Sequence, residues 1–389
     1  MAMQSGEKAP NRQVPRTPGP KAARQAFVFA STALAVLALI LVPLPASAGT
    51  NPVLVFHAIV GQCWYGNAPA SVTVTVTWRD AAGHLKSHFT TTSDTSGYYY
   101  PSEAVCAAHH VAVLDRIRAD TGFNARTFKV RALTVSFNRS TKIVGGQAPP
   151  HFTLSIYVWH QNISGYGMPY PSCTTTATAN SSGVYAKNVK NLPSDGVNCT
   201  GTFNPIGGDR AAVSFGDGAG DSVERDATAP YLLLTLGSPT VSGATMENLH
   251  VTIHLRTAAG APRGSAAPHA GPRGLFSGTI RSGSAAKVNV KAGNLVDGNW
   301  AGAVGFKVPH LTITWDTGAN SVMGRCTPHT LYGLILNYSG GTYVGDGRTD
   351  ADGYTTPIQP AETIGAGDKV TLICARNSGD RFELVRVLQ

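Results

Sequence analysis

Two groups of aspartates are close enough in sequence to bind a calcium ion, which takes six to eight oxygen ligands from carboxylates and carbonyls. Neither group has the twelve-residue, helix-flanked loop of an EF-hand. The alternative is that these aspartates only form turns, because an Asp side chain accepts hydrogen bonds from the backbone that follows it. Calcium is the only cofactor that the sequence suggests. The groups are Asp346, Asp350 and Asp352, and Asp217, Asp221 and Asp226.

The tripeptide Asp-Thr-Gly occurs twice, at Asp120 and at Asp316, and it resembles the aspartic-peptidase motif. That chemistry needs two carboxylates that share one proton. Asp316 follows an apolar stretch, residues 311–315, whereas the residues before Asp120 are charged. The sequence favours two polar turns over a peptidase that uses Asp120 and Asp316, and no catalytic residue is predicted.

Histidines and cysteines do not suggest a transition-metal site. His250 and His254 share one face of a predicted strand, where residues four apart are too distant to chelate one ion easily. No C-x-x-C motif occurs. Several aromatic residues can instead stack on sugars or on a protein partner, or fill the core of a sandwich. These are Trp64, Tyr65, Tyr98, Tyr99, Tyr100 and Trp300.

Short alternating segments position these residues. Residues 72–78 and 251–255 alternate apolar and polar side chains, and glycine and proline separate such segments. No long segment shows a helical period of 3.6 residues. The pattern predicts an all-β chain of small sandwiches. The length after residue 48 exceeds that of one ordinary core and predicts several domains.

The first 48 residues have the features of a secretory signal peptide. A basic region precedes an apolar run over residues 26–42, and Ala46-Ser47-Ala48 gives a cleavage site before Gly49. The apolar run is short for a membrane-spanning helix. We therefore expect a secreted chain without a membrane span after cleavage. No sortase-type signal follows, so we expect a free end at Gln389.

Net charge argues against nucleic acid as a partner. The chain has 31 Lys and Arg and 22 Asp and Glu, but five of the basic residues and one acidic residue lie in the predicted signal peptide. The remaining excess is small and scattered, which is unlike a nucleic-acid-binding face. It allows a mild attraction to acidic cell-wall polymers.

Four turns of one type indicate four repeats. Asp94–Gly97 is followed by similar segments at 180–183 and 350–353, and by a degraded copy at 271–274. Each repeat is expected to open on a Val then Gly strand, at residues 59–61, 143–145, 240–243 and 321–324. Each is expected to close on a Gly-Asp turn, at 208–209 and 367–368, with residues 286–290 at that place in the third repeat. The segment 258–274 is predicted to be a long loop. The predicted limits are a signal peptide over 1–48 and repeats over 49–133, 134–232, 233–311 and 312–389.

These motifs resemble the tandem immunoglobulin-like and carboxypeptidase-regulatory-like (transthyretin-like) repeats of secreted bacterial proteins. The resemblance covers nearly all of the chain after residue 48. It implies small β-sandwiches and a non-catalytic role as stalks, adhesin segments or accessory modules beside enzymes.

All six cysteines lie after the predicted signal peptide, and an even number in an exported chain favours three disulfides. Sequence alone permits fifteen pairings. The repeat limits favour one bridge inside each of three repeats: Cys63–Cys106, Cys173–Cys199 and Cys326–Cys374.

The sequence therefore predicts a secreted, non-catalytic protein of about four β-sandwiches with a structural, adhesive or binding role outside the cell. The expected partner is an extracellular or cell-wall protein or glycan. The main alternative is a carbohydrate-binding or enzyme-accessory protein.

Overall fold

The computed structural model describes residues 54–161, 163, 171–192, 198–199, 201–302 and 304–389. The predicted signal peptide lies outside these residues. Strands dominate, and the described residues contain one short α-helix, α2 (Glu103–Ala108). No helix in the described ranges is long and apolar enough to cross a membrane. The fold is thus all-β, as the alternating segments predicted.

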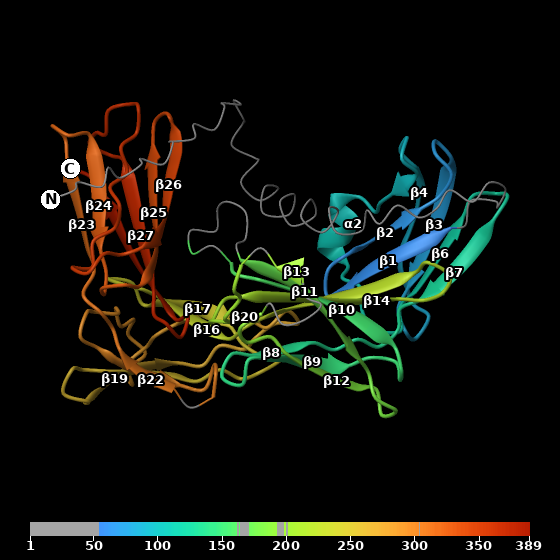
Figure 1. The fold of residues 1–389 in the computed structure, drawn as a ribbon, viewed down its shortest axis with the longest axis horizontal. Coiled ribbons are helices and arrows are strands. Elements are labelled where there is room, and N and C mark those ends of the chain that lie inside the picture. The colour runs from blue at the N-terminus through green and yellow to red at the C-terminus, as the bar shows by residue number, and fades with distance from the viewer. Residues whose placement is uncertain (1–53, 162, 164–170, 193–197, 200, 303) are drawn as a thin grey trace, which may run out of the picture. The chain divides into compact units, whose positions relative to one another are not determined.

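Residues 54–229, which we call the first half, form three sheets (Figure 1). The largest has eight strands in the order β13 (Asn198–Cys199), β11 (Ser172–Thr178), β10 (Thr153–Trp159), β14 (Arg210–Gly216), β15 (Ser222–Thr228), β1 (Val55–Val60), β2 (Trp64–Asn67) and β5 (Tyr98–Tyr99). A four-stranded sheet has the order β4 (Leu85–Thr92), β3 (Thr73–Arg79), β6 (Arg116–Asp120) and β7 (Ala125–Lys129). A three-stranded sheet has the order β12 (Val184–Asn188), β9 (Ile143–Gln147) and β8 (Ser136–Asn138).

Residues 231–388, the second half, also form three sheets. The largest has seven strands in the order β20 (Leu275–Thr279), β17 (Thr240–Ala244), β16 (Tyr231–Thr235), β28 (Arg381–Val387), β27 (Lys369–Ala375), β25 (Leu331–Tyr338) and β26 (Gly341–Arg348). A four-stranded sheet has the order β19 (Pro262–Ala266), β18 (Ile253–Arg256), β21 (Leu295–Gly298) and β22 (Val304–Lys307). The last sheet pairs β23 (Thr312–Asp316) with β24 (Ser321–Arg325).

One strand order recurs four times in these sheets. The orders β4-β3-β6-β7, β11-β10-β14-β15, β19-β18-β21-β22 and β26-β25-β27-β28 place equivalent strands at equivalent positions. Short ladders accompany them, in the orders β1-β2-β5, β8-β9-β12 and β16-β17-β20, with β23-β24 as the fourth. A four-stranded sheet with a shorter partner is, in coarse outline, the immunoglobulin-like sandwich.

Two parallel strand pairs join these units two by two. β1 pairs in parallel with β15, and β16 pairs in parallel with β28. The first strand of one predicted repeat thereby continues the sheet of the next. Buried apolar residues accordingly form two clusters, one within residues 54–229 and one within residues 232–388. The four-repeat division itself stays a prediction; residue 232, one of its limits, lies inside β16.

Local sequence explains most strands. In β3, Val74, Val76 and Trp78 are fully buried, and the intervening threonines face outward. The segment 258–274 was wrongly predicted to be one long loop, because it contains β19. β19 is an edge strand that starts with Pro262, and proline is tolerated there because no partner needs its missing N–H.

We call the four predicted turns at residues 94–97, 180–183, 271–274 and 350–353 the early turns. They share one set of backbone hydrogen bonds. The N–H of the first turn residue donates to the carbonyl of the residue after the glycine, as Asp350 does to Tyr354. The glycine N–H donates to the carbonyl of the first turn residue, as Gly353 does to Asp350. Asp94, Asn180 and Asp350 also accept two backbone N–H groups on Oδ1, which Gly271 lacks the side chain to do. The four glycines have positive φ: Gly97, Gly183, Gly274 and Gly353.

Each early turn is also tied to the strand beside it. The glycine carbonyls accept from the N–H groups of Ala68, Ala148, Thr245 and Cys326, respectively. These bonds correct the predicted opening of the first repeat. Cys326 follows Gly324 by two residues as Ala68 follows Gly66, so the equivalent of the Gly324 strand is β2, and Gly61 belongs to the turn before it.

A second type of turn, which we call the late turn, precedes the second-to-last strand of each unit, namely β6, β14, β21 and β27. In each, the Asx side chain accepts the N–H of the residue three positions earlier, as Asp209 does from Ile206. The Asx backbone carbonyl accepts the N–H of the residue just after the last strand, as Asp209 does from Ala229. The prediction for the third repeat was wrong: Gly293-Asn294 forms this turn, not residues 286–290. In the first repeat Leu114 takes the positive φ that glycine takes elsewhere. The four Asx residues are Asp115, Asp209, Asn294 and Asp368.

The structure contains three disulfides, Cys63–Cys106, Cys173–Cys199 and Cys326–Cys374, which are the three predicted pairs. They close segments separated by 43, 26 and 48 residues. In the loop-entropy account each stabilises the fold by roughly 3–4 kcal/mol.

An aspartate caps each parallel strand pair, and we call these places the first and second joint. At the first joint Asp221 Oδ1 accepts the N–H of Phe56 in β1 at 3.0 Å. At the second, Asp380 Oδ1 accepts the N–H of Leu232 in β16 at 3.0 Å. Both aspartates stand directly before the last strand of their half, so the two joints are equivalent.

Candidate binding surface

The Asp-Thr-Gly aspartates do not form a dyad. Asp120 ends β6 in the first half, and Asp316 ends β23 in a two-stranded sheet of the second half. Asp120 accepts the N–H of Gly122 and contacts Arg118, which lowers the pKa of its carboxyl, and Asp316 accepts the N–H of Ala319. Each of these two carboxylates serves its own turn, and the two do not lie together as a peptidase pair would.

The aspartates of the second calcium candidate are paired with cations. Asp221 Oδ2 lies 2.6 Å from Arg126, and Asp226 Oδ2 lies 2.6 Å from Arg210. Asp217 lies 3.6 Å from Arg131. Guanidinium groups thus provide the positive charge that a calcium ion would have supplied.

In the first calcium candidate, Asp350 Oδ1 accepts the N–H groups of Asp352 and Tyr354 within its own turn. Asp346 lies in β26. Across the described residues, no three His, Cys, Asp or Glu side chains are grouped so as to hold a metal ion. Calcium binding by Asp346, Asp350 and Asp352 stays an untested prediction.

Histidines are dispersed. His84 pairs with Asp80 in a hairpin turn, and His88 bonds Thr77 across two strands. His250 lies edge-on to His269, with ring centroids 4.6 Å apart, whereas His254 belongs to β18. The two histidines predicted to share a strand face are therefore in different surroundings.

The six candidate aromatic residues divide into two sets. Trp64, Tyr99 and Trp300 are buried, with at most 2% of their surface exposed. The other three lie on the outward positions of β2 and β5 or just beyond. Because side chains alternate along a strand, Trp64 and Tyr65 point to opposite faces, as do Tyr98 and Tyr99.

The outward tyrosines gather with one histidine in what we call the tyrosine patch: His57, Tyr65, Tyr98 and Tyr100. The ring centroids of Tyr65, Tyr98 and Tyr100 are 6.1–6.2 Å apart. His57 from β1 stacks on Tyr65 at 4.6 Å. Tyr100 is 49% exposed, and the other three are partly exposed. Rings from three neighbouring segments thus form one aromatic surface at the β5 edge of the eight-stranded sheet.

Polar groups border the patch. His57 Nδ1 lies 2.7 Å from Ser222 Oγ, and Glu224 lies across from Ile59 on β15. Burial, followed by the charge of Glu224, raises the pKa of Tyr65, and burial lowers the pKa of His57. Both shifts disfavour the charged form of the Tyr65 and His57 rings, which suits stacking against a neutral ligand. His57 was not among the predicted residues; its outward position between Phe56 and Ala58 was the available signal.

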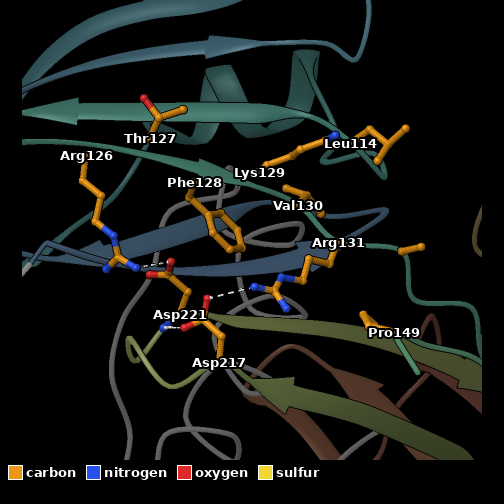
Figure 2. Close-up of a pocket in the computed structure, with 11 residues that line it drawn as sticks. Leu114, Arg126, Thr127, Phe128, Lys129, Val130, Arg131, Pro149, Asp217 and Asp221 are labelled. Atoms are coloured by element: carbon orange, nitrogen blue, oxygen red, sulfur yellow. Dashed lines mark hydrogen bonds and ion pairs between the residues drawn. The ribbon is translucent and has the colours of Figure 1, made fainter. Parts of the chain in front are cut away.

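An open groove lies elsewhere in the first half, beside β7 (Figure 2). Its volume is about 560 Å³. Residues 126–132 line one side, and Asp217, Asp221 and Pro149 line the other. We call it the β7 groove.

No protein-family model matches the sequence, and no curated protein matches it. Several solved structures share weak similarity. A tetra-tandem repeat from the extending region of a large adhesion protein is 16% identical, with 87% of this chain and 100% of that chain covered and a TM-score of 0.18. A calcium-stabilised adhesin of an ice-binding Antarctic bacterium is 14% identical, with 88% and 99% covered and a TM-score of 0.16.

Escherichia coli α2-macroglobulin is 11% identical, and this chain covers 29% of its length with a TM-score of 0.17. TM-scores of this size carry no argument about function, so the site must be judged from its own residues.

Proposed function

We propose that this chain is a non-catalytic binding protein that acts outside the cell and binds a carbohydrate through the tyrosine patch. The observation that carries the proposal is the patch itself: three tyrosine rings and one histidine ring on one sheet face. The apolar segment 26–42 with its Ala46-Ser47-Ala48 site supports export, and three disulfides suit an oxidising compartment.

Carbohydrate is favoured over protein because of the composition of the surface. Ring faces carry negative charge density that attracts the polarised C–H groups of a sugar ring, and tyrosine hydroxyls add hydrogen bonds. Ser222 and Glu224 supply further polar groups at the border. A protein interface of this kind instead has an apolar, fully buried centre.

The rest of the fold supports a scaffold role for the same protein. Backbone hydrogen bonds hold each early turn to the strand beside it, and the joint aspartates hold the added strands β1 and β16. The three disulfides restrain the chain further. A rigid scaffold reduces the entropy lost when a surface binds its ligand.

The test uses chain 49–389 in polysaccharide pull-down and glycan-array assays. We expect saturable binding that falls about tenfold or more in the double variant Tyr98→Ala/Tyr100→Ala, equivalent to about 1.4 kcal/mol. Tyr343→Ala, which alters the tyrosine pair of β25 and β26 in the second half, is the matched control and should bind as the wild type does. Glycan binding that the double variant retains would refute the patch, and binding only to proteins would refute the ligand class.

A further inference from the structure

The edge of the first four-stranded sheet is open at β7. β7 is the last strand in the order β4-β3-β6-β7. The hydrogen bonds from Thr121 N to Asn124 O and from Val130 N to Asp115 O show which residues of β7 bond to β6: the even-numbered ones do. The odd-numbered residues Ala125, Thr127 and Lys129 therefore direct their N–H and C=O groups away from β6. Within the described residues nothing bonds to these groups.

Two of the three equivalent edges in the same molecule are covered by an added strand, whereas β22 ends its sheet as β7 does. β15 and β28 occupy the place of β7 in their sheets, and they pair in parallel with β1 and β16. In both cases an aspartate just before the edge strand, Asp221 or Asp380, accepts the first N–H of the added strand. Asn124 stands just before β7, the place in the sequence that Asp221 and Asp380 hold before β15 and β28.

The β7 groove gives an added strand room along this edge. Figure 2 shows Arg126 pointing to Asp221 and Arg131 pointing to Asp217 across the groove. Both acidic side chains of the lining are thus paired with arginines. Lys129 is exposed, and in the part of the chain that the structure describes no acidic side chain pairs with it.

We propose that the β7 groove binds an extended acidic segment of a partner protein, which adds in parallel to β7 as a fifth strand. The row of free N–H and C=O groups matches a peptide backbone and not a polysaccharide. Lys129, whose charge no acidic side chain among the described residues compensates, attracts acidic side chains of the segment. This site is separate from the tyrosine patch, so either can fail without the other.

Two octapeptides with the same sequence, alternating Asp and Val, test the proposal. In one of them alternate amides are N-methylated, so that it cannot pair with an edge strand. Fluorescence polarisation with chain 49–389 should detect the plain peptide at least about tenfold more tightly than the methylated one. Equal affinity would show charge attraction without strand addition, and no binding at about 1 mM would equally overturn the proposal.

Variants localise the site. Thr127→Pro removes an N–H that has no internal partner, so the sheet is retained while the added strand is blocked; binding should be lost with the melting temperature nearly unchanged. Lys129→Glu should weaken binding about tenfold or more. Lys291→Glu, at an exposed lysine in a late turn, is the control. Binding that survives in a folded Thr127→Pro protein, or that Lys291→Glu weakens equally, would overturn the assignment to β7.

Discussion

The two joints place an aspartate at the same point of the fold and surround it differently. Asp380 Oδ1 accepts from Trp300 Nε1 at 3.0 Å and from Arg139 at 3.0 Å, in addition to Leu232 N. Trp300 is fully buried, and the side chains of Arg139 and Asp380 are 7% and 1% exposed. Asp221 Oδ1 accepts the N–H of Phe56, and Asp221 Oδ2 pairs with Arg126. The Arg126 side chain is 24% exposed and lines the β7 groove.

The difference shows that backbone and side chains have separate tasks at a joint. The backbone bond from the aspartate to the added strand is the same in both halves and aligns the sheets. The neighbouring side chains decide whether the space beside the joint is filled, as by Trp300, or open, as beside Arg126. The second joint is therefore suited to holding the fold, and the first keeps a groove available for a ligand.

The largest effect expected from this comparison concerns the aspartates themselves. Asp380→Ala leaves Arg139 charged and buried and leaves Trp300 Nε1 unpaired, so we expect a loss of about 3–5 kcal/mol in the free energy of unfolding. Asp221→Ala should cost about 1–3 kcal/mol, because water in the groove can solvate Arg126. Urea unfolding followed by tryptophan fluorescence measures both. Equal losses would contradict the distinction between a filled and an open joint.

A smaller effect separates turns that share local bonds but not neighbours. Gly353 and Gly83 both have positive φ and close Asp-x-x-Gly turns. A Cβ at Gly353 would collide with the carbonyl of Cys326, whereas nothing lies within 4 Å of the corresponding position at Gly83. We expect Gly353→Ala to cost about 2–4 kcal/mol, combining backbone strain and overpacking, and Gly83→Ala about 1 kcal/mol.

Thermal or urea unfolding of the two glycine variants gives the comparison directly. If both variants lose the same free energy of unfolding, the collision with the Cys326 carbonyl adds nothing to the cost of the backbone strain. The same reasoning applies to Gly97, Gly183 and Gly274, whose added Cβ atoms would meet the carbonyls of Ala68, Ala148 and Thr245.

The elements that the sequence predicted well are those encoded by neighbouring residues. The early turns were recognisable because an Asp or Asn side chain and a glycine three residues later define the bonds locally. The late turn of the first repeat was missed because Leu114, not glycine, takes the positive φ. Gly61 was mistaken for the opening glycine because only strand pairing distinguishes it from Gly66.

The candidate sites required long-range information. Six aromatic residues were candidates, but strand register decides that Tyr65 faces outward and Trp64 inward. The tyrosine patch joins His57 to residues about forty positions later through β1, β2 and β5. The β7 groove brings residues 126–132 beside 217–221, which no local pattern indicates.

A pH effect distinguishes the first joint from the second. His57 follows Phe56 in β1, and Leu233 occupies the equivalent position in β16. Burial lowers the pKa of His57, so the unfolded chain takes up the proton more readily than the folded protein. The unfolding free energy should therefore fall as the pH drops from about 6.5 through the lower folded-state pKa.

The variant His57→Leu, which copies the second joint, should lose part of this decrease. His110→Leu, at an exposed histidine outside both joints, should keep all of it. The measurement is urea unfolding at a series of pH values between neutrality and about pH 5. An unchanged slope in His57→Leu would show that this histidine is not responsible.

The smallest expected effect concerns metal dependence of the early turns in the two halves. Asp350 in the second half and Asn180 in the first make the same two Oδ1 bonds, so the negative charge is not needed for the turn. If Asp350 serves only the turn, Asp350→Asn should change stability by less than about 0.5 kcal/mol, with or without calcium. If the group Asp346, Asp350 and Asp352 binds calcium, the wild type should melt at a lower temperature in chelator, and Asp350→Asn should remove that difference, because ligand stabilisation follows occupancy. Melts of both proteins in calcium and in chelator decide between these outcomes, with Asn180→Asp as the reciprocal variant. A calcium-dependent melt in the wild type alone would give the second half a metal site that the first half lacks.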